Sequence, residues 1–427
     1  MFNKIKKKYL NKSSFIMNVT TLTTGELIGY GILIITSPIL TRLYNPPDFG
    51  IYSLYMAITT IFSVIATGRY EFAIMLPKKE KDALSIFVLC LIIVTGITLL
   101  VLIIITSFKR LIVEFFKNKS IGRLLYFTCL TIFFIGIYNT LSFWLNRKKS
   151  YNKLAFLRIS QITSAILLQI GLGFSKLNNI GLILGNIGGY GISSICVFQN
   201  ILKKYKKNLK LIAKKDIIKN ARKYINFPKI NSFQALIDSL RVNGEVFLIS
   251  YFFGKEQLGL YFLTLKVLKT PSVFIGSAVS RVFFQRASLA YNKKKEDLQK
   301  LIKKLLVGLF IISSPIFLII IFFGPTIFKI IFNKKWELAG VYARILSPWI
   351  FFNFITSPIS TIPFIFNKQK ELFFFSIIGN FIIFGSLFYA GYFLHNIKIG
   401  FYLISLLMSL YFIFVIRWIY KISELRK

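Results

Sequence analysis

Length and composition place this chain in a membrane. It has 427 residues, of which 55% are hydrophobic and 17% aromatic, and its mean hydropathy is +0.65. Soluble proteins average about 45–50% apolar residues even with glycine counted, so the composition excludes an ordinary soluble enzyme. Lys and Arg outnumber Asp and Glu by 55 to 15, a formal net charge of +40. These charges lie between apolar runs and not on one soluble face, so they do not indicate nucleic-acid binding.

Apolar segments of spanning length follow one another along the whole chain. A membrane-spanning helix needs roughly 20 apolar residues. The predicted spans are 16–40, 50–76, 84–107, 121–145, 154–175, 179–201, 230–253, 257–285, 301–324, 339–366, 371–393 and 397–419. The sequence therefore predicts an all-α integral membrane protein with about 12 transmembrane helices. The basic N-terminus resembles the start of a signal peptide, but no cleavage site stands out, so we interpret 16–40 as a retained first helix.

The distribution of Lys and Arg predicts the orientation and the division into halves. Most of them fall in segments that lie on one side if the N-terminus is cytoplasmic, and an excess of Lys and Arg marks cytoplasmic loops. With an even number of spans, both termini are then cytoplasmic. We predict an N-terminal six-helix bundle over 1–201, a basic cytoplasmic linker over 202–229 and a C-terminal six-helix bundle over 230–427.

Two short motifs suggest that the halves are repeats. The second span opens with Phe49–Tyr52 (FGIY) and the eighth with Leu258–Tyr261 (LGLY). Six helices in each half predict a parallel repeat related by a pseudo-two-fold axis, an arrangement found in some transporters. A chance match of two short motifs in a biased sequence is the alternative.

Charged residues inside the spans gather in the first, second, seventh and eighth. Such residues are costly in hydrocarbon and are candidates for function. A mainly cationic cavity would suit a phosphate or pyrophosphate, which Arg can bind through two hydrogen bonds. The candidates for substrate binding are Arg69, Arg241, Lys266, Lys269 and Arg281, and those for ion coupling are Glu26, Asp238 and Glu71. The alternatives are charges that reach the membrane surface and local pairs such as Asp238 with Arg241, three residues apart.

Signatures of enzymes and of metal sites are absent from the sequence. It has no P-loop, no HExxH and no GxSxG motif. One histidine and three cysteines without CxxC spacing do not suggest a metal site or a disulfide framework. We therefore expect no enzymatic activity and no cofactor, with H⁺ or Na⁺ as the candidate coupling ion.

Two segments resemble a known family. Leu40–Tyr52 (LTRLYNPPDFGIY) resembles the tRLYsPedFGiys segment of Wzx-type oligosaccharide flippases, and Arg69–Lys79 (RYEFAIMLPKK) resembles their RYElAIvLPkk segment. That family is the polysaccharide transporter family of the multidrug/oligosaccharidyl-lipid/polysaccharide exporter (MOP) superfamily. The close match covers about residues 40–90, and only Arg69, Tyr70 and Glu71 carry over by motif.

The resemblance implies a function in polysaccharide export. It implies two six-helix bundles around a cavity, alternating access that is ion-coupled, and an inner-membrane flippase for undecaprenyl-pyrophosphate-linked oligosaccharide units of O-antigen lipopolysaccharide or capsule. The expected partners are that lipid-linked oligosaccharide and membrane lipid, with a polysaccharide polymerase and a chain-length regulator as further candidates and no nucleic acid. Two rival functions stay open: a membrane-embedded polysaccharide polymerase or ligase, and a drug or cation exporter of the same superfamily.

Overall fold

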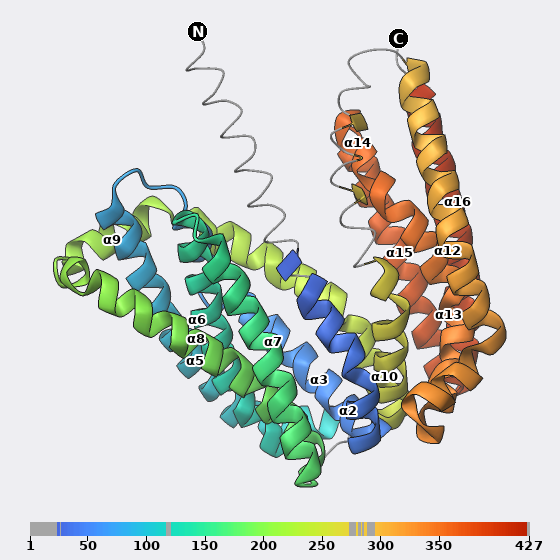
Figure 1. Ribbon diagram of the computed structural model, residues 1–427, viewed down its shortest axis with the longest axis horizontal. Helices are drawn as coiled ribbons and strands as arrows, with labels where there is room; N and C mark the ends of the chain where they lie inside the picture. The colour runs from blue at the N-terminus through green and yellow to red at the C-terminus, as the bar shows by residue number, and fades with distance from the viewer. Residues whose placement is uncertain are drawn as a thin grey trace. The chain divides into compact units, whose positions relative to one another are not determined.

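The computed structural model describes residues 24–25, 27–116, 121–272, 279–280, 283, 286–287 and 295–424. These residues form helices joined by short turns, with no strand among them (Figure 1). Glu26 and Arg281, two of the predicted site residues, lie outside the described ranges. The prediction of an all-α fold is confirmed.

The helices follow the chain in this order. The first half contains α2 (Ser37–Leu43), α3 (Pro46–Ser63), α4 (Tyr70–Ala73), α5 (Glu80–Phe115), α6 (Ile121–Arg147), α7 (Tyr151–Phe174), α8 (Asn178–Lys210), α9 (Lys214–Lys223) and the π-helix η1 (Phe227–Asn231). It is followed by α10 (Ser232–Leu268), α12 (Lys295–Phe332), η3 (Lys334–Trp336), α13 (Glu337–Thr356), η4 (Ser357–Thr361), α14 (Ile362–Ile365), α15 (Gln369–Tyr389), η5 (Ala390–Leu394) and α16 (Ile397–Glu424).

Eight helical stretches in the described ranges are long and apolar enough to span a membrane. They are Glu80–Phe115, Ile121–Arg147, Tyr151–Phe174, Asn178–Lys210, Leu298–Phe332, Lys334–Ile365, Gln369–Leu394 and Ile397–Ser423. They match predicted spans three to six and nine to twelve. The other four predicted spans are mostly helical where described, but they are shorter or more polar. Those four spans are also the ones in which the sequence concentrates its internal charges.

Three predicted spans differ from the structure in detail. The second, 50–76, is interrupted, because α3 ends at Ser63 and a turn over 64–69 precedes α4. The seventh and eighth are joined, because α10 runs through the expected loop with a single break at Gly254, where φ is 81°. Glycine lacks a Cβ and adopts this conformation without steric cost, so the break needs no separate loop.

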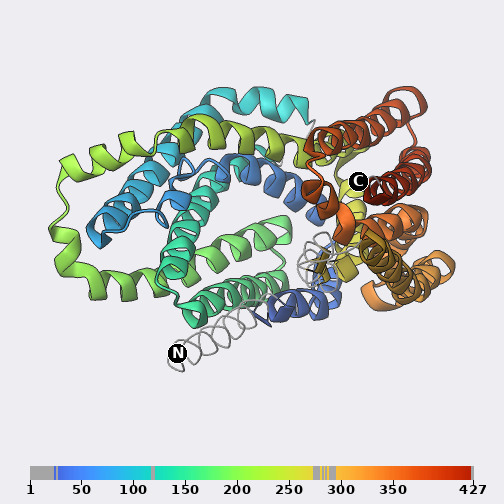
Figure 2. The same ribbon diagram turned by 90° about the horizontal axis from the view of Figure 1, so that it is seen from above.

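The chain divides into two compact units. One consists of Met1–Tyr44 with Ile51–Asn243, and the other of Asn45–Gly50 with Gly244–Lys427. Both α3 and α10 therefore begin in one unit and end in the other. The basic stretch 203–229 belongs to the first unit and contributes the end of α8, α9 and most of η1 (Figure 2). The sequence-based division into two six-helix bundles separated by the linker 202–229 describes repeats and not these compact units, and it stays a prediction.

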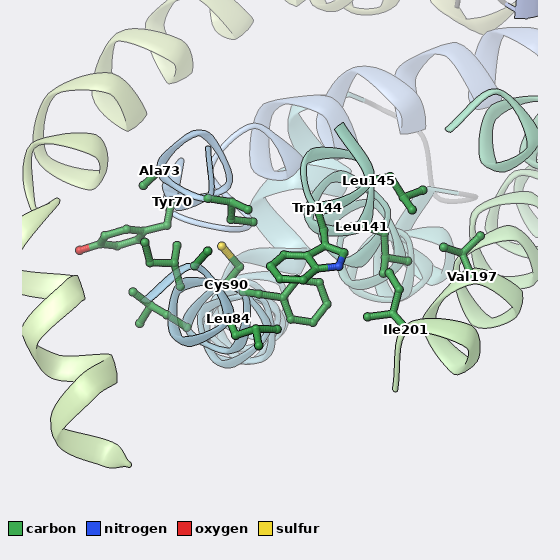
Figure 3. Packing of buried hydrophobic residues seen from close by; sticks show 14 of the residues in the cluster. Tyr70, Ala73, Leu84, Cys90, Leu141, Trp144, Leu145, Val197 and Ile201 are labelled. Carbon is green, nitrogen blue, oxygen red and sulfur yellow. The ribbon is translucent and has the colours of Figure 1, made fainter. Parts of the chain in front are cut away.

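The core of the first unit contains a large cluster of aromatic and aliphatic side chains. Trp144 of α6 is buried, with its ring centroid 5.4 Å from that of Phe87 and 5.3 Å from that of Tyr205. Figure 3 shows it between Cys90 on one side and Ile201 on the other. This packing fixes the α4 segment, and hence the turn before it, against α5 and α6.

The residues around Tyr44 hold α2 and the start of α3 in place. The Tyr44 hydroxyl donates to the backbone carbonyl of Gln169 over 2.6 Å. A Cβ on Gly181 would lie 2.5 Å from that hydroxyl oxygen, so glycine is required beside it. In the other unit, the Asn45 N–H donates to the Asp48 carboxylate over 3.0 Å, which satisfies a free N–H at the start of α3.

The two glycines of the repeated motifs contact each other. A Cβ built on Gly50 of α3 would lie 1.7 Å from the carbonyl oxygen of Lys255, and one on Gly259 of α10 would lie 1.8 Å from that of Pro46. The contact is reciprocal, since each glycine meets the residue four positions before the other. This symmetry is what two copies of one motif produce when they pack on each other, and it supports the interpretation of the motifs as repeats.

Candidate functional site

A tight turn between α3 and α4 carries Arg69. Gly68 and Arg69 both have left-handed backbone conformations, with φ of 57° and 60°. Such a conformation is uncommon for a residue other than glycine and clusters at functional sites. The turn ends α3 and directs the Arg69 side chain toward the start of α10.

The guanidinium of Arg69 has few interaction partners. Its Nη1 lies 3.8 Å from Oε1 of Glu71, and its Cζ lies 5.4 Å from the centre of the Phe72 ring. The Nε atom is buried and has no hydrogen-bond partner among the described residues. Glu71 is 3% exposed and accepts a hydrogen bond from the Thr67 hydroxyl. The turn therefore leaves the Arg69 guanidinium without a full set of hydrogen bonds.

A pocket of about 430 Å³ lies within the first unit between this turn and the first three turns of α10. Thr60, Val64, Arg69 and Phe72 line one side. Asn231, Gln234, Ala235, Asp238, Ser239, Val242 and Asn243 line the other. We call this the Arg69 pocket. Its volume lies in the range of about 300–1,000 Å³ that is typical of ligand sites.

The α10 side of the pocket is a polar helix face. Asn231, Gln234 and Asp238 follow one another at spacings of three and four residues, which places them on one side of the helix. Asn231 also ends the π-helix η1, and such irregular turns occur frequently at functional sites. The predicted pair of Asp238 with Arg241 is present but weak, since its atoms are 3.9 Å apart and both side chains are about half exposed.

The structure brings together some of the predicted site residues. Arg69 and Asp238 line one pocket, and Glu71 and Arg241 pair with them. Lys266 lies near the end of α10 and Lys269 directly after it, both in the other unit, where Lys266 is half-buried and Lys269 exposed. Their grouping with the other residues in one cavity stays a prediction.

Sequence reasoning missed the uncharged residues of the pocket. It searched the spans for ionisable groups and so passed over Asn231, Gln234, Asn243 and Phe72. The signal was present, because the amides of 231 and 234 continue the spacing of Asp238 along one helix face. An amide is also costly in hydrocarbon when it is unpaired.

Tyr70, in the segment that resembles the family, anchors the basic stretch 203–229. The Tyr70 hydroxyl donates to the backbone carbonyl of Ala221 in α9 over 2.8 Å. Lys81 and Asp216 form an ion pair at 2.9 Å, and the hydrogen bond from this ammonium lowers the pKa of the Asp216 carboxyl. Asn220 of α9 donates to Oγ of Ser85 over 2.7 Å. These contacts fix α9 on the start of α5.

No metal site is evident in the described part of the chain. No group of three or more His, Cys, Asp or Glu side chains there is arranged to hold a metal ion. The pocket instead offers one cation, one carboxylate, amides and hydroxyls, a set that binds polar organic groups by hydrogen bonding.

Comparison with known proteins relates the chain to polysaccharide export. The family model described as "Polysaccharide biosynthesis protein" matches residues 39–341. No curated protein matches the chain.

Solved structures of the MOP superfamily share the fold. An inward-facing multidrug resistance MATE family transporter of this superfamily is 12% identical, with a TM-score of 0.70, and the match covers 96% of this chain and 98% of that one. Lipid II flippase MurJ in an inward closed conformation is 17% identical, with a TM-score of 0.64 and coverages of 94% and 87%. A MOP superfamily transporter from Pyrococcus furiosus, described as having a binding pocket of reverse polarity, is 12% identical, with a TM-score of 0.59 and coverages of 95% and 95%. At these identities the likeness establishes the fold alone.

Proposed function

Because this chain belongs to the polysaccharide biosynthesis protein family, we propose that it is a flippase for undecaprenyl-pyrophosphate-linked oligosaccharide repeat units. It moves them from the inner to the outer leaflet of the bacterial inner membrane. The repeat units are those of O-antigen, capsule or a similar surface polymer. The MurJ-like fold supports this proposal, since MurJ is a lipid II flippase.

One observation carries the proposal: several polar residues form a pocket in helices that lie outside the eight long apolar stretches of the described ranges. The Arg69 pocket is built from the end of α3 and the start of α10, neither of which is among the eight apolar stretches of the described ranges. Polar side chains inside a membrane protein almost always face the protein interior or a water-filled cavity. A pocket there can receive part of a polar head while the polyprenyl chain stays in lipid.

The mechanism we propose is alternating access. The sugar and pyrophosphate head enters from the cytoplasmic side, where the cations of the predicted cavity replace part of its hydration. This lowers the cost of moving a polar head through hydrocarbon. The two units then rock, and the head is released outside. A carboxylate such as Glu71 or Asp238 binds H⁺ or Na⁺ and resets the carrier.

Location and partners follow from the same proposal. We infer an inner-membrane protein with both termini cytoplasmic, because most Lys and Arg residues fall in segments assigned to that side. We infer a carrier and not an enzyme. A polymerase that joins the translocated units and a regulator of chain length are its proposed partners, since they would use its product.

The test uses a strain that lacks the protein and a membrane-impermeant glycan label. We expect the lipid-linked oligosaccharide to be labelled only after the membrane is opened, because untranslocated units stay in the inner leaflet. Restoring the wild-type chain should return label to intact spheroplasts. Labelling of intact spheroplasts in the deletion strain would refute the proposal and favour a polymerase or ligase, which acts after translocation.

A further inference from the structure

We propose that the Arg69 pocket binds an uncharged sugar ring of the oligosaccharide head, and that the pyrophosphate binds elsewhere. This inference rests on the proposed function and assigns a part of the substrate to a part of the site. It also departs from the sequence-based expectation that Arg69 serves a cationic pyrophosphate site.

The first argument is the charge of the pocket. Among the described residues, Arg69 and Asp238 are the only charged ones that line the pocket, and their charges cancel. A pyrophosphate carries several negative charges, and the carboxylate of Asp238 repels it. An uncharged ligand meets no such repulsion, and a sugar diol can form hydrogen bonds with both ionic groups.

The second argument is the set of hydrogen-bonding groups left open. The side-chain amides of Asn231 and Gln234 are exposed in the pocket and form no hydrogen bond with another described residue. Asn243 uses its Nδ2 on the backbone carbonyl of Ser239, at 2.8 Å, which leaves its Oδ1 as an acceptor. An amide both donates and accepts. Sugar hydroxyls do the same, whereas a fully ionised phosphate only accepts.

The third argument is shape. Phe72 is 40% exposed and Val242 is 61% exposed, and both line the pocket. These apolar surfaces suit the C–H face of a sugar ring, as the amides suit its hydroxyls. A volume of about 430 Å³ has room for a sugar ring but not for a whole lipid-linked oligosaccharide, so the remainder of the head binds outside the pocket.

The experiment compares two probes on the purified full-length protein. The first is the free oligosaccharide, released by mild acid from the lipid carrier that accumulates in the deletion strain. The second is undecaprenyl pyrophosphate without sugar. We expect the double variant N231A/Q234A to bind the oligosaccharide about tenfold more weakly or worse, since it loses two hydrogen-bonding amides. Its binding of undecaprenyl pyrophosphate should equal that of the wild type and shows that the variant is folded.

A matched variant and a conservative variant complete the design. Gln199 and Asn200 are exposed on α8 and do not line the pocket, so Q199A/N200A should bind both probes like the wild type. If N231A/Q234A binds neither probe, the variant Q234E is tested in its place. This change keeps the size of an exposed side chain and replaces its donor with a charge, so it should still weaken oligosaccharide binding alone.

The outcomes separate the inference from the proposed function. If the wild type does not bind the oligosaccharide, if both amide variants bind it normally, or if Q234E weakens both probes equally, the inference is overturned while the flippase function stands. If the deletion strain accumulates no lipid-linked oligosaccharide, the proposed function is refuted and the inference falls with it.

Discussion

The contact between Gly50 and Gly259 predicts a specific loss of stability when either glycine becomes alanine. Each would-be Cβ overlaps a backbone carbonyl oxygen, which cannot turn away as a flexible side chain can. Alanine at either position must therefore push α3 and α10 apart. The expected result is a less stable protein, although alanine favours a helix by about 1 kcal/mol over glycine.

The size of the effect follows from the distances. A Cβ on Gly50 would sit 1.7 Å from the Lys255 oxygen, and one on Gly259 would sit 1.8 Å from the Pro46 oxygen. Since carbon contacts are optimal at about 3.5–4.0 Å, the backbones must separate by nearly 2 Å at this point. Overpacking of this kind costs about 1–3 kcal/mol or more. The nearby packing of Phe49 on buried Trp336, with ring centroids 5.1 Å apart, would loosen as well.

The assay is the midpoint of thermal unfolding of the purified protein in detergent. Gly96 of α5 is exposed, and a Cβ there meets no atom within 4 Å, so G96A serves as the control and should be neutral or slightly stabilising. The double variant G50A/G259A should lose less than the sum of the single losses, because the first alanine has already separated the helices. If G50A and G259A unfold at the temperature of G96A, the inferred backbone contact is wrong.

Three further changes test other parts of the structure. Tyr44→Phe should destabilise the protein by about 0.5–1.5 kcal/mol, since it removes one buried hydrogen bond; an unchanged unfolding midpoint would contradict that role. Replacing Lys266 and Lys269 together with Met should abolish surface polymer at normal membrane levels of the protein, and normal polymer would remove both from the predicted cavity. Asp216→Asn should weaken the docking of α9, which hydrogen exchange measures. Because the hydrogen bond from Lys81 lowers the pKa of Asp216 below its unfolded value, this stabilisation is present at neutral pH and is lost as pH falls through the lowered pKa. The wild type should then approach the variant in acid, and a constant difference would contradict the ion pair.

The apolar part of the fold could be predicted from the sequence because length and hydropathy decide it. A run of about 20 apolar residues has few alternatives to a spanning helix. The long stretches Glu80–Phe115 and Leu298–Phe332 follow this rule. The rule is weaker where polar residues interrupt the run. It did not predict the break of α3 at Ser63 or the continuation of α10 through Gly254, because local turn geometry and packing decide both.

The site could be predicted only in part, because charge is an incomplete guide to a binding pocket. The cost of an ionised group in hydrocarbon identified Arg69 and Asp238, and the structure brings these two together in one pocket. It did not identify Asn231 or Gln234, whose amides are uncharged. The sequence alone also does not show that the turn at Arg69 lies next to the start of α10, because the two segments are far apart in the chain.

The residues of the family segments divide into two kinds by what they contact. Tyr44, Asp48, Gly50 and Tyr70 each meet backbone atoms: a carbonyl on α7, an N–H at the start of α3, a carbonyl on α10 and a carbonyl on α9. Such contacts specify how helices pack, whatever the ligand. Arg69 is different, since its Nε faces no partner and its turn opens into the pocket. In these segments, most of the residues considered therefore determine helix packing, and Arg69 alone belongs to the pocket. The chemistry that selects the ligand then depends on side chains outside the motif, on the polar face of α10.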